Sequence, residues 1–367
     1  MKKILAFVRG EVVLTAAVVL AVVSAFFVPP SLDYFSYIDW DTLALLFSLM
    51  AVMKGFQKEG LFQFVGSSLL KRTSTSRTML LALVFLPFFC SMVITNDVSL
   101  ITFVPFGITV LKLARQEHLV VPLVAMQTLA ANLGSMLTPM GNPQNLYLYS
   151  QSGMGFGTLC LIMLPYSVIS ALCLVLWILC YRSQPVIPVE VDAQLGSPLS
   201  LDLYALGFGL CLLGIFGLVP PLIIAAIVLV FLLIKDRKVL KAVDYSLLGT
   251  FAAFFIFTGN LAAIPFFQQF LASILDGFVV PVSVLASQVI SNVPAALLLS
   301  GFTTQWEDLI IGCNLGGLGT LIASMASLIS YKFLAKEYPK ERRKYFLWFT
   351  LSNVAMLALL LLANLLF

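Results

Sequence analysis

Long apolar runs follow one another along almost the whole of this chain, and they leave few folds open to it. They lie near residues 11–28, 41–53, 79–95, 98–111, 119–131, 159–180, 200–218, 221–234, 246–262, 279–290, 309–330 and 345–366. The chain is 60% hydrophobic and 10% charged, whereas a soluble domain carries about 25% charged residues. A membrane β-barrel is excluded, because its strands alternate in hydrophobicity over about 10 residues. We therefore predict an all-α integral membrane protein.

The distribution of Lys and Arg predicts orientation rather than a nucleic-acid partner. The net charge is +4, and most basic residues fall in short loops, which favours the cytoplasmic side for those loops. Lys2, Lys3 and Arg9 predict a cytoplasmic N-terminus, followed by a first membrane helix at 11–28 that is retained. We expect a multi-pass protein of the plasma membrane whose partners are the lipid bilayer and a solute, with no nucleic acid.

Two segments have the wrong length for ordinary spans. Residues 78–111 start after Arg77 and end at Lys112, so both ends are predicted to be cytoplasmic. They are too many for one span of about 20 residues and too few for two spans with a loop. Residues 278–302 form two legs around Ser291-Asn292-Val293-Pro294 with acidic flanks, and each leg reaches about half of the ~30 Å core. We predict two re-entrant hairpins, the first entering from the cytoplasm and the second from outside.

A polar phrase recurs within the apolar segments. Asn132-Leu133-Gly134 leads through Thr138 to Leu146, and Asn314-Leu315-Gly316 leads through Thr320 to Leu328 with the same spacing. Such residues are unfavourable there, because lipid cannot hydrogen-bond a backbone that leaves the helix. Two copies therefore suggest a binding site built from two related halves, each with a broken helix.

Further anchors recur in the same order and predict inverted repeats. Asp39-Trp40 corresponds to Asp244-Tyr245, and the hairpin tip Thr95-Asn96 corresponds to Ser291-Asn292. We predict a first repeat at 1–181, with hairpin 78–111 and broken helix 119–150, and a second at 219–367, with hairpin 278–302 and broken helix 309–331. Residues 182–218 supply the linker and the connecting helix.

Broken helices near the midplane can hold a solute, because they expose unpaired N–H groups at one end and carbonyls at the other. The positive N-termini suit anions. The polar side chains predicted to contact solute are Asn96, Asn142, Gln144, Asn145, Asn292, Ser324 and Ser327. The alternative is structural: asparagines can cap the hairpin turns, and serines can bond back to their own helix.

Asp97 is the carboxylate that we place deep in the membrane, and an acid there is a functional hypothesis by default. It is predicted to couple transport to Na⁺ or H⁺, with oxygens from Thr95, Thr138, Ser291 and Thr320. The alternative is that Asp97 accepts hydrogen bonds from the hairpin's own N–H groups. We expect no cofactor beyond this coupling ion. Lys54, Lys58 and Glu59 interrupt the end of helix 41–53 and are expected to snorkel to the interface.

These residues resemble the ion transporter superfamily, which includes arsenite permeases, sodium/proton antiporters and divalent-anion/sodium symporters with a citrate-transporter-like domain. The resembling segments are Thr95-Asn96-Asp97, Ser291-Asn292-Val293-Pro294, Gly134–Asn145 and Glu59-Gly60-Leu61-Phe62. The resemblance implies a secondary transporter in which a hairpin-bearing unit moves against a scaffold, often as a homodimer.

We therefore expect an ion-coupled secondary active transporter of a small anion or oxyanion, arsenite-like or a small carboxylate, working by elevator-type alternating access. One alternative is a Na⁺/H⁺ antiporter on the same scaffold, and another is a passive anion channel. A membrane enzyme has the least support, because no carboxylate pair, metal set or activated nucleophile is predicted at membrane depth.

Overall fold

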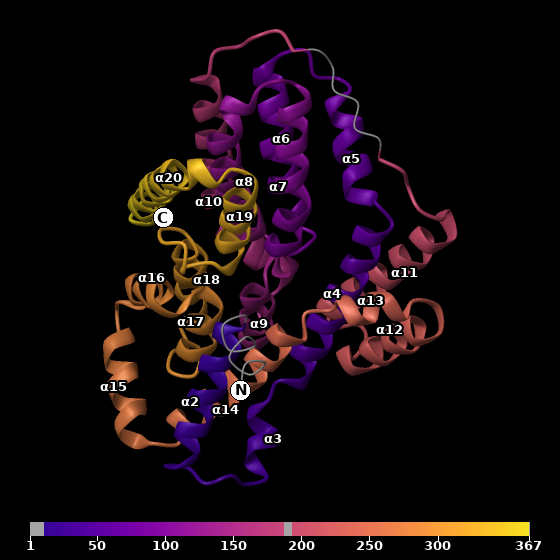
Figure 1. Cartoon of the computed structure of the whole chain (residues 1–367). Coiled ribbons are helices and arrows are strands. Elements are labelled where there is room, and N and C mark those ends of the chain that lie inside the picture. The colour runs from indigo at the N-terminus through magenta and orange to yellow at the C-terminus, as the bar shows by residue number, and fades with distance from the viewer. Residues whose placement is uncertain (1–10, 187–192, 367) are drawn as a thin grey trace.

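The computed structural model describes residues 11–186 and 193–366, and these residues form helices joined by loops (Figure 1). The β-structure in the described ranges is one isolated bridge, between Thr75 and Pro185. Within these described residues, five helices are long and apolar enough to cross a membrane, or six if the pair bent by 113° at residues 265–290 counts as one span. The predicted all-α membrane class is confirmed. Lys2, Lys3 and Arg9 lie outside the described residues.

The element order is the same in the two halves of the chain. The first half contains α2 (Val12–Ala25), α3 (Asp33–Tyr37), α4 (Trp40–Lys58), α5 (Leu61–Leu70), α6 (Ser76–Cys90), α7 (Asn96–Leu113), α8 (Val120–Ser135), α9 (Pro143–Ser152) and α10 (Phe156–Leu179). The connection contains α11 (Pro198–Ile215). The second half contains α12 (Pro221–Lys235), α13 (Arg237–Ala242), α14 (Tyr245–Ala262), α15 (Pro265–Leu275), α16 (Val279–Ile290), α17 (Asn292–Leu299), α18 (Trp306–Gly316), α19 (Met325–Glu337) and α20 (Arg342–Asn364). Thus α4 to α10 and α14 to α20 follow one plan, although the inverted orientation of the halves stays a prediction.

The halves exchange helices with each other. Helix α2 packs on α14 and α12 packs on α4, while α7 packs on α19 and α17 packs on α9. Hydrogen bonds mark two of these pairings: Lys112 Nζ lies 2.8 Å from Glu337 Oε2, and the Tyr147 and Ser300 hydroxyls lie 2.8 Å apart. Reciprocal pairings of this kind are what a two-fold relation between the halves produces.

Several boundaries differ from the sequence prediction. Helix α4 continues to Lys58, so Lys54 and Lys58 lie within the helix and do not interrupt it. Helix α19 continues to Glu337, beyond the predicted end at 331. Both extra segments contain Lys residues whose long apolar stems fit a helix near the membrane surface, so a hydropathy limit places the ends too early.

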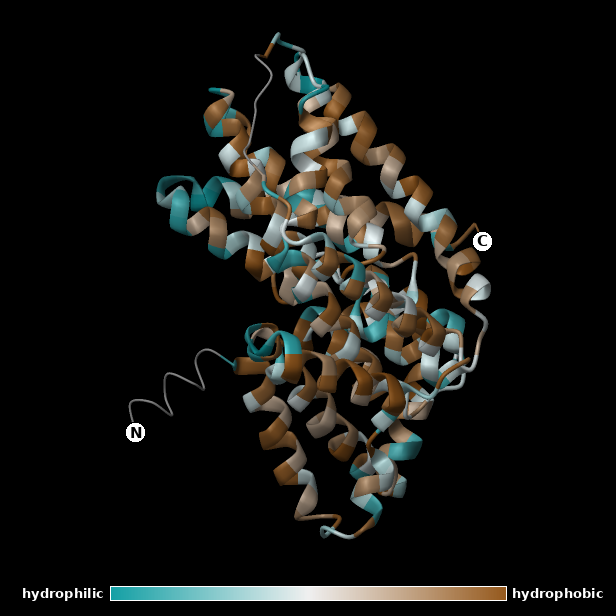
Figure 2. Ribbon diagram, turned by 90° about the vertical axis from the view of Figure 1, so that its right-hand side faces the viewer, coloured by the Kyte–Doolittle hydropathy of each residue, from teal (hydrophilic) through white to brown (hydrophobic). Residues whose placement is uncertain are grey.

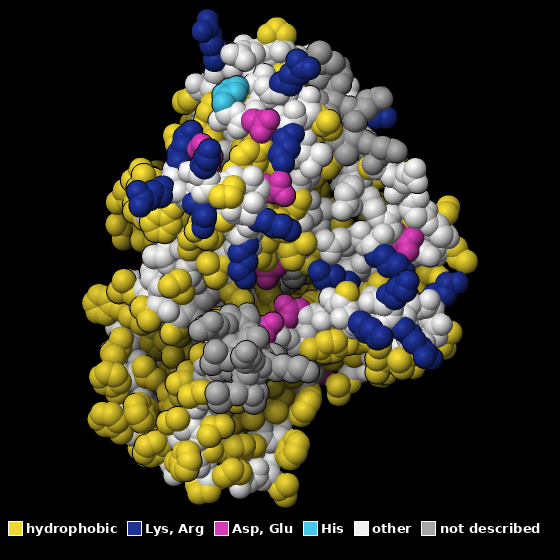
Figure 3. Space-filling view, viewed as in Figure 1, with side chains coloured by type: hydrophobic (Ala, Val, Ile, Leu, Met, Phe, Trp, Pro, Cys, Tyr) yellow, Lys and Arg dark blue, Asp and Glu magenta, His cyan; other side chains and the backbone are white. Residues whose placement is uncertain are grey.

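Polar residues occupy the middle of the fold as well as its ends (Figure 2). Helix α8 lies in the interior of the fold, since every residue from Val120 to Ser135 is buried. In the view of Figure 3, Lys and Arg side chains gather over the upper half and over α11 to α13, while the lower half is largely hydrophobic. This separation fits a membrane protein with one strongly basic side.

Candidate functional site

Four helices begin within one connected polar region. They are the second legs of the two hairpins, α7 at Asn96 and α17 at Asn292, and the helices after the two breaks, α9 at Pro143 and α19 at Met325. The turn at Pro139–Gly141 follows the end of α8, and Pro143 begins α9. A proline at a helix start leaves no backbone N–H without a partner, because it has none. Because each helix N-terminus carries partial positive charge, this region favours negative charge.

Asn132 of α8 connects the first hairpin tip to the second break. Its Oδ1 accepts hydrogen bonds from Asn96 Nδ2 at 2.9 Å and from Ser324 Oγ at 3.1 Å. Its Nδ2 donates to Ser327 Oγ at 3.3 Å. Asn96 is 5% exposed and Asn132 8%, so this chain of bonds is almost closed to solvent. Three of the predicted solute contacts are therefore already hydrogen-bonded to one another through Asn132.

Asn314 of α18 makes the corresponding connection to the first break. Its Nδ2 donates to Asn145 Oδ1 at 2.6 Å, and its Oδ1 accepts from Asn142 Nδ2 at 3.4 Å. Asn142 also caps α9, since its Oδ1 accepts from the Asn145 N–H at 3.0 Å. The offset of 182 residues that relates Asn132 to Asn314 also relates Asn142 and Asn145 to Ser324 and Ser327. The contacts therefore repeat together with the sequence, each asparagine reaching into the opposite half.

The second hairpin tip is held by its backbone and leaves its amide free. Ser291 has φ 75°, a left-handed value that strains any residue except glycine. The Asn292 N–H donates to the Ala323 carbonyl at 2.9 Å, and Ser291 Oγ donates to the same carbonyl at 3.3 Å. Asn292 is 5% exposed, and no described residue hydrogen-bonds its side-chain amide. A buried amide without a partner is available to a ligand.

Gln144 gives a second unsatisfied amide. It follows Pro143 at the start of α9, is 1% exposed, and its Nε2 has no partner among the described residues. A native structure rarely leaves a buried donor unpaired. Gln144 and Asn292 are therefore the two predicted solute contacts that the protein itself does not satisfy.

The predicted ion ligands have mixed surroundings. Asp97 lies in the first turn of α7, and no described group hydrogen-bonds its carboxylate. Thr95 precedes α7 without a side-chain cap bond. Thr138 Oγ1 donates to the Met92 carbonyl, and Thr320 is exposed, its Oγ1 accepting from the Ala323 N–H at 3.3 Å. These two threonines have structural partners, while Asp97 has none.

Lys54 of α4 interacts electrostatically with Asp97 and with Asp244, the residue that caps α14. Its Nζ donates to Gln57 Oε1 at 3.2 Å, and Gln57 Nε2 donates to Thr102 Oγ1 of α7 at 3.0 Å. A cation beside an intramembrane carboxylate reduces the cost of keeping both charged. Sequence reasoning placed Lys54 at the interface, and the structure places it beside the first hairpin.

Two glutamines hold the backbone around the site. Gln127 Nε2 donates to the Leu83 carbonyl at 2.9 Å and to the Phe103 carbonyl at 3.1 Å, one on each leg of the first hairpin. Leu83 needs this donor, because the residue four positions on is Pro87, which has no N–H. Gln288 of α16 donates to the Gly316 carbonyl at 3.0 Å and the Leu318 carbonyl at 2.9 Å, where α18 ends.

The residues that sequence reasoning missed are Asn132, Asn314, Gln127, Gln288 and Lys54. Asn132 and Asn314 begin the repeated Asn-Leu-Gly phrase, so the repeat could have identified them. The prediction used the phrase only to place the helix breaks that follow it. Among the described residues, no three His, Cys, Asp or Glu side chains are grouped to hold a metal ion.

Comparison with known proteins identifies relatives along most of the chain. A family model described as a citrate transporter matches residues 4–304. The uncharacterized transporter MJ0456 of Methanocaldococcus jannaschii is 31% identical over 82% of this chain and 83% of its own length. The inner membrane protein YbiR of Escherichia coli is 32% identical over 84% of both chains. The silicon efflux transporter LSI3 of rice is 32% identical over 36% of this chain and 27% of its own length.

Proposed function

This chain belongs to the citrate transporter family, and we propose that it couples the movement of a small anion or oxyanion to an ion gradient across the plasma membrane. The family is described as a citrate transporter, and the relative MJ0456 is named a transporter, so the sequence prediction of a multi-pass secondary transporter is confirmed. The solute, the coupling ion and the mechanism of movement are parts of the proposal.

The observation that carries the proposal is the meeting of four helix N-termini with two unsatisfied buried amides. Asn292 and Gln144 offer donors, and the N-termini add positive potential without a fixed cation in the hydrogen-bonded cluster. Such a site suits a small solute with several oxygens and little charge. The family's description supports a carboxylate, and the name of the rice relative supports an oxyacid or oxyanion.

Asp97 and Lys54 are the proposed coupling pair. When no coupling ion is bound, the positive charge of Lys54 balances the negative charge of Asp97. When Na⁺ or H⁺ is bound, that ion balances the charge of Asp97 instead. The scaffold in this proposal comprises α2, α4 and α11 to α14, and the moving unit comprises the hairpins and the broken helices. The elevator step separates Lys54 from Asp97, because the two residues stand on different units.

Transport assays in proteoliposomes test the site. We expect Asn292→Ala and Gln144→Ala to lower solute uptake at least tenfold, because each amide faces a ligand rather than a protein partner. Asn353→Ala is the matched control: it removes a buried asparagine of α20 that donates to its own helix at 2.9 Å. If folded Asn292→Ala and Gln144→Ala proteins both transport at wild-type rates, the solute binds elsewhere.

The alternative of a Na⁺/H⁺ antiporter uses the same carboxylate. It predicts cation exchange in vesicles without any added anion, abolished by Asp97→Asn. The anion transporter instead predicts that Asp97→Asn retains binding of the solute in a thermal-shift assay but loses accumulation driven by the ion gradient. Arsenite, phosphate, sulfate and small carboxylates are the solutes to compare. Flux that ignores every ion gradient would support the passive anion channel.

A further inference from the structure

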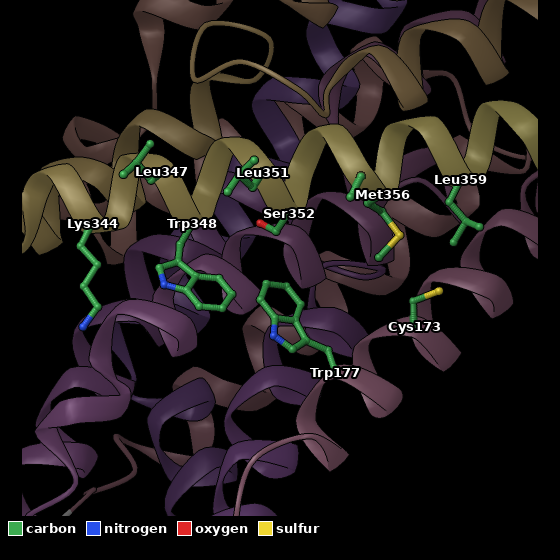
Figure 4. Close-up of a pocket in the computed structure, with 10 residues that line it drawn as sticks. Cys173, Trp177, Lys344, Leu347, Trp348, Leu351, Ser352, Met356 and Leu359 are labelled. Carbon is green, nitrogen blue, oxygen red and sulfur yellow. The ribbon is translucent and has the colours of Figure 1, made fainter.

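Helices α10 and α20 enclose an apolar groove on the outside of the molecule. Its volume is about 530 Å³, and it runs from Cys173, Met356 and Leu359 to Trp177, Trp348 and Lys344 (Figure 4). The indole rings of Trp177 and Trp348 are stacked, with centroids 5.9 Å apart and planes at 18°. The groove is therefore a formed, elongated cavity with aromatic walls at one end and aliphatic walls at the other.

A second cavity continues this groove at the end where Lys344 lies. It has a volume of about 310 Å³ and shares Lys344 and Trp348 with the groove. Its other lining residues include His118, Arg182, Gln116 and Gln184, and none of the described residues that line either cavity is Asp or Glu. The apolar groove thus lies next to a basic, hydrogen-bonding chamber, with Lys344 and Trp348 lining both.

The basic chamber has a fixed frame. The Ser76 hydroxyl donates to the Arg182 carbonyl at 3.3 Å, and Ser76 exchanges backbone and side-chain bonds with Gln184. Gln116 Oε1 is buried and lacks a partner among the described residues. The Lys344 ammonium lies 3.6 Å from Glu341, but both side chains are largely exposed, so this pair competes weakly with another anion.

We propose that the joined cavities bind one membrane phospholipid with an anionic headgroup. An acyl chain lies in the groove against Trp177 and Trp348, and the phosphate is held by Lys344 and Arg182. Arg and Lys are well suited to phosphate oxygens, and juxtamembrane basic residues attract anionic lipids. The aromatic pair sits where apolar and polar parts meet, the depth that Trp prefers in membranes.

Charge complementarity favours a lipid over a second copy of this chain. An apolar helix face from another copy would fill the groove but bring no negative charge to Arg182, and it would leave Lys344 with only its exposed partner Glu341. A free phosphate would satisfy the basic chamber but leave the apolar groove exposed. One amphiphile satisfies both.

Tryptophan fluorescence tests the proposal directly, because two of the four Trp residues line the groove. In a Trp40→Phe/Trp306→Phe background, the protein is placed in vesicles containing brominated phosphatidylglycerol or brominated phosphatidylcholine at equal bromine content. We expect phosphatidylglycerol to quench more strongly. Each single change, Arg182→Gln or Lys344→Gln, should lower the preference for phosphatidylglycerol over phosphatidylcholine roughly fivefold. The double change should abolish the difference in quenching between the two lipids. Lys336→Gln, a basic residue of α19 that lines neither cavity, is the matched control.

The other outcomes contradict the proposal in distinct ways. Equal quenching by both lipids in the unchanged background means that the groove holds acyl chains without selecting a headgroup. Weak quenching by both, together with dimers trapped by a crosslinker, means that a second copy covers the groove. Ser352→Phe, which narrows the groove, should reduce quenching by both lipids, and it separates binding in the groove from binding at the headgroup chamber alone.

Discussion

Asn132 and Asn314 stand 182 residues apart in the chain, and each holds the broken helix of the opposite half. Asn132 bonds to Ser324 and Ser327, and Asn314 bonds to Asn142 and Asn145. The partners are serines on one side and asparagines on the other. The two sides of the cluster thus share a geometry but differ in the number of donors and acceptors available to a solute.

We predict that Asn314→Ala destabilises the protein more than Ser327→Ala. Asn314 bonds to two amides, so its removal leaves the buried Asn145 Oδ1 without a donor and Asn142 Nδ2 with only its bond to Ser135, at a cost of about 1–3 kcal/mol. Among the described residues, the Ser327 hydroxyl hydrogen-bonds only Asn132, at 3.3 Å. Thermal unfolding in detergent measures the difference, and equal shifts for the two variants would contradict it.

The support of the first hairpin predicts a rescue. Gln127→Leu should lower the free energy of unfolding by about 1–3 kcal/mol, because the Leu83 carbonyl loses its donor. In a Pro87→Ala background the N–H of residue 87 can donate to the Leu83 carbonyl. Gln127→Leu should therefore lower the free energy of unfolding by less in that background. A double-mutant cycle that gives additive effects would show that Gln127 does not serve the proline break.

Gly134 is predicted to tolerate no side chain. A Cβ at this position would lie 2.0 Å from the Phe88 carbonyl oxygen, on the first leg of the hairpin. Gly134→Ala should therefore displace α8 from α6 and lower both the yield of folded protein and transport. Gly157→Ala is the control, because a Cβ there meets nothing within 4 Å. Comparable loss in both variants would mean that helix flexibility, rather than close packing, explains the requirement.

The elevator part of the proposed function predicts a selective block by crosslinking. Gln57 and Thr102 join α4 to α7 at 3.0 Å, across the proposed scaffold and moving unit. In a background without native cysteines, Gln57→Cys/Thr102→Cys treated with a short bifunctional thiol reagent should stop transport. Lys112→Cys/Glu337→Cys, within the moving unit, should crosslink without stopping it. Transport that survives both crosslinks would rule out separation of α4 from α7.

The class of fold and the places where helices break were accessible from the sequence. Apolar runs fix the helices, and Gly141, Pro143 and the tip asparagines mark the breaks, because these residues end helices by their covalent geometry. Helix ends such as Lys58 were missed, because a lysine stem can extend an apolar helix toward the surface.

The connections within the site were less accessible. Hydropathy does not distinguish Asn132 and Asn314 from other polar residues in apolar segments. Their role depends on which helices pack together, and that is decided by the tertiary structure. Lys54 was missed for the same reason: its meaning comes from Asp97 and Asp244, which lie far along the chain. The structure also separates Thr138 and Thr320, which have protein partners, from Asn292 and Gln144, whose amide nitrogens no described residue hydrogen-bonds.

The packing of α2 on α14 has a consequence for the order in which the protein is synthesised and assembled. The ribosome completes α2 more than 200 residues before α14 emerges, and Asn260 of α14 supplies the amide that bonds Ser24 of α2 at 3.0 Å. Until then α2 lacks the helix on which it packs in the folded protein. Helix α2 can therefore take its final position only after α14 is inserted, so this contact between the two halves forms late in synthesis.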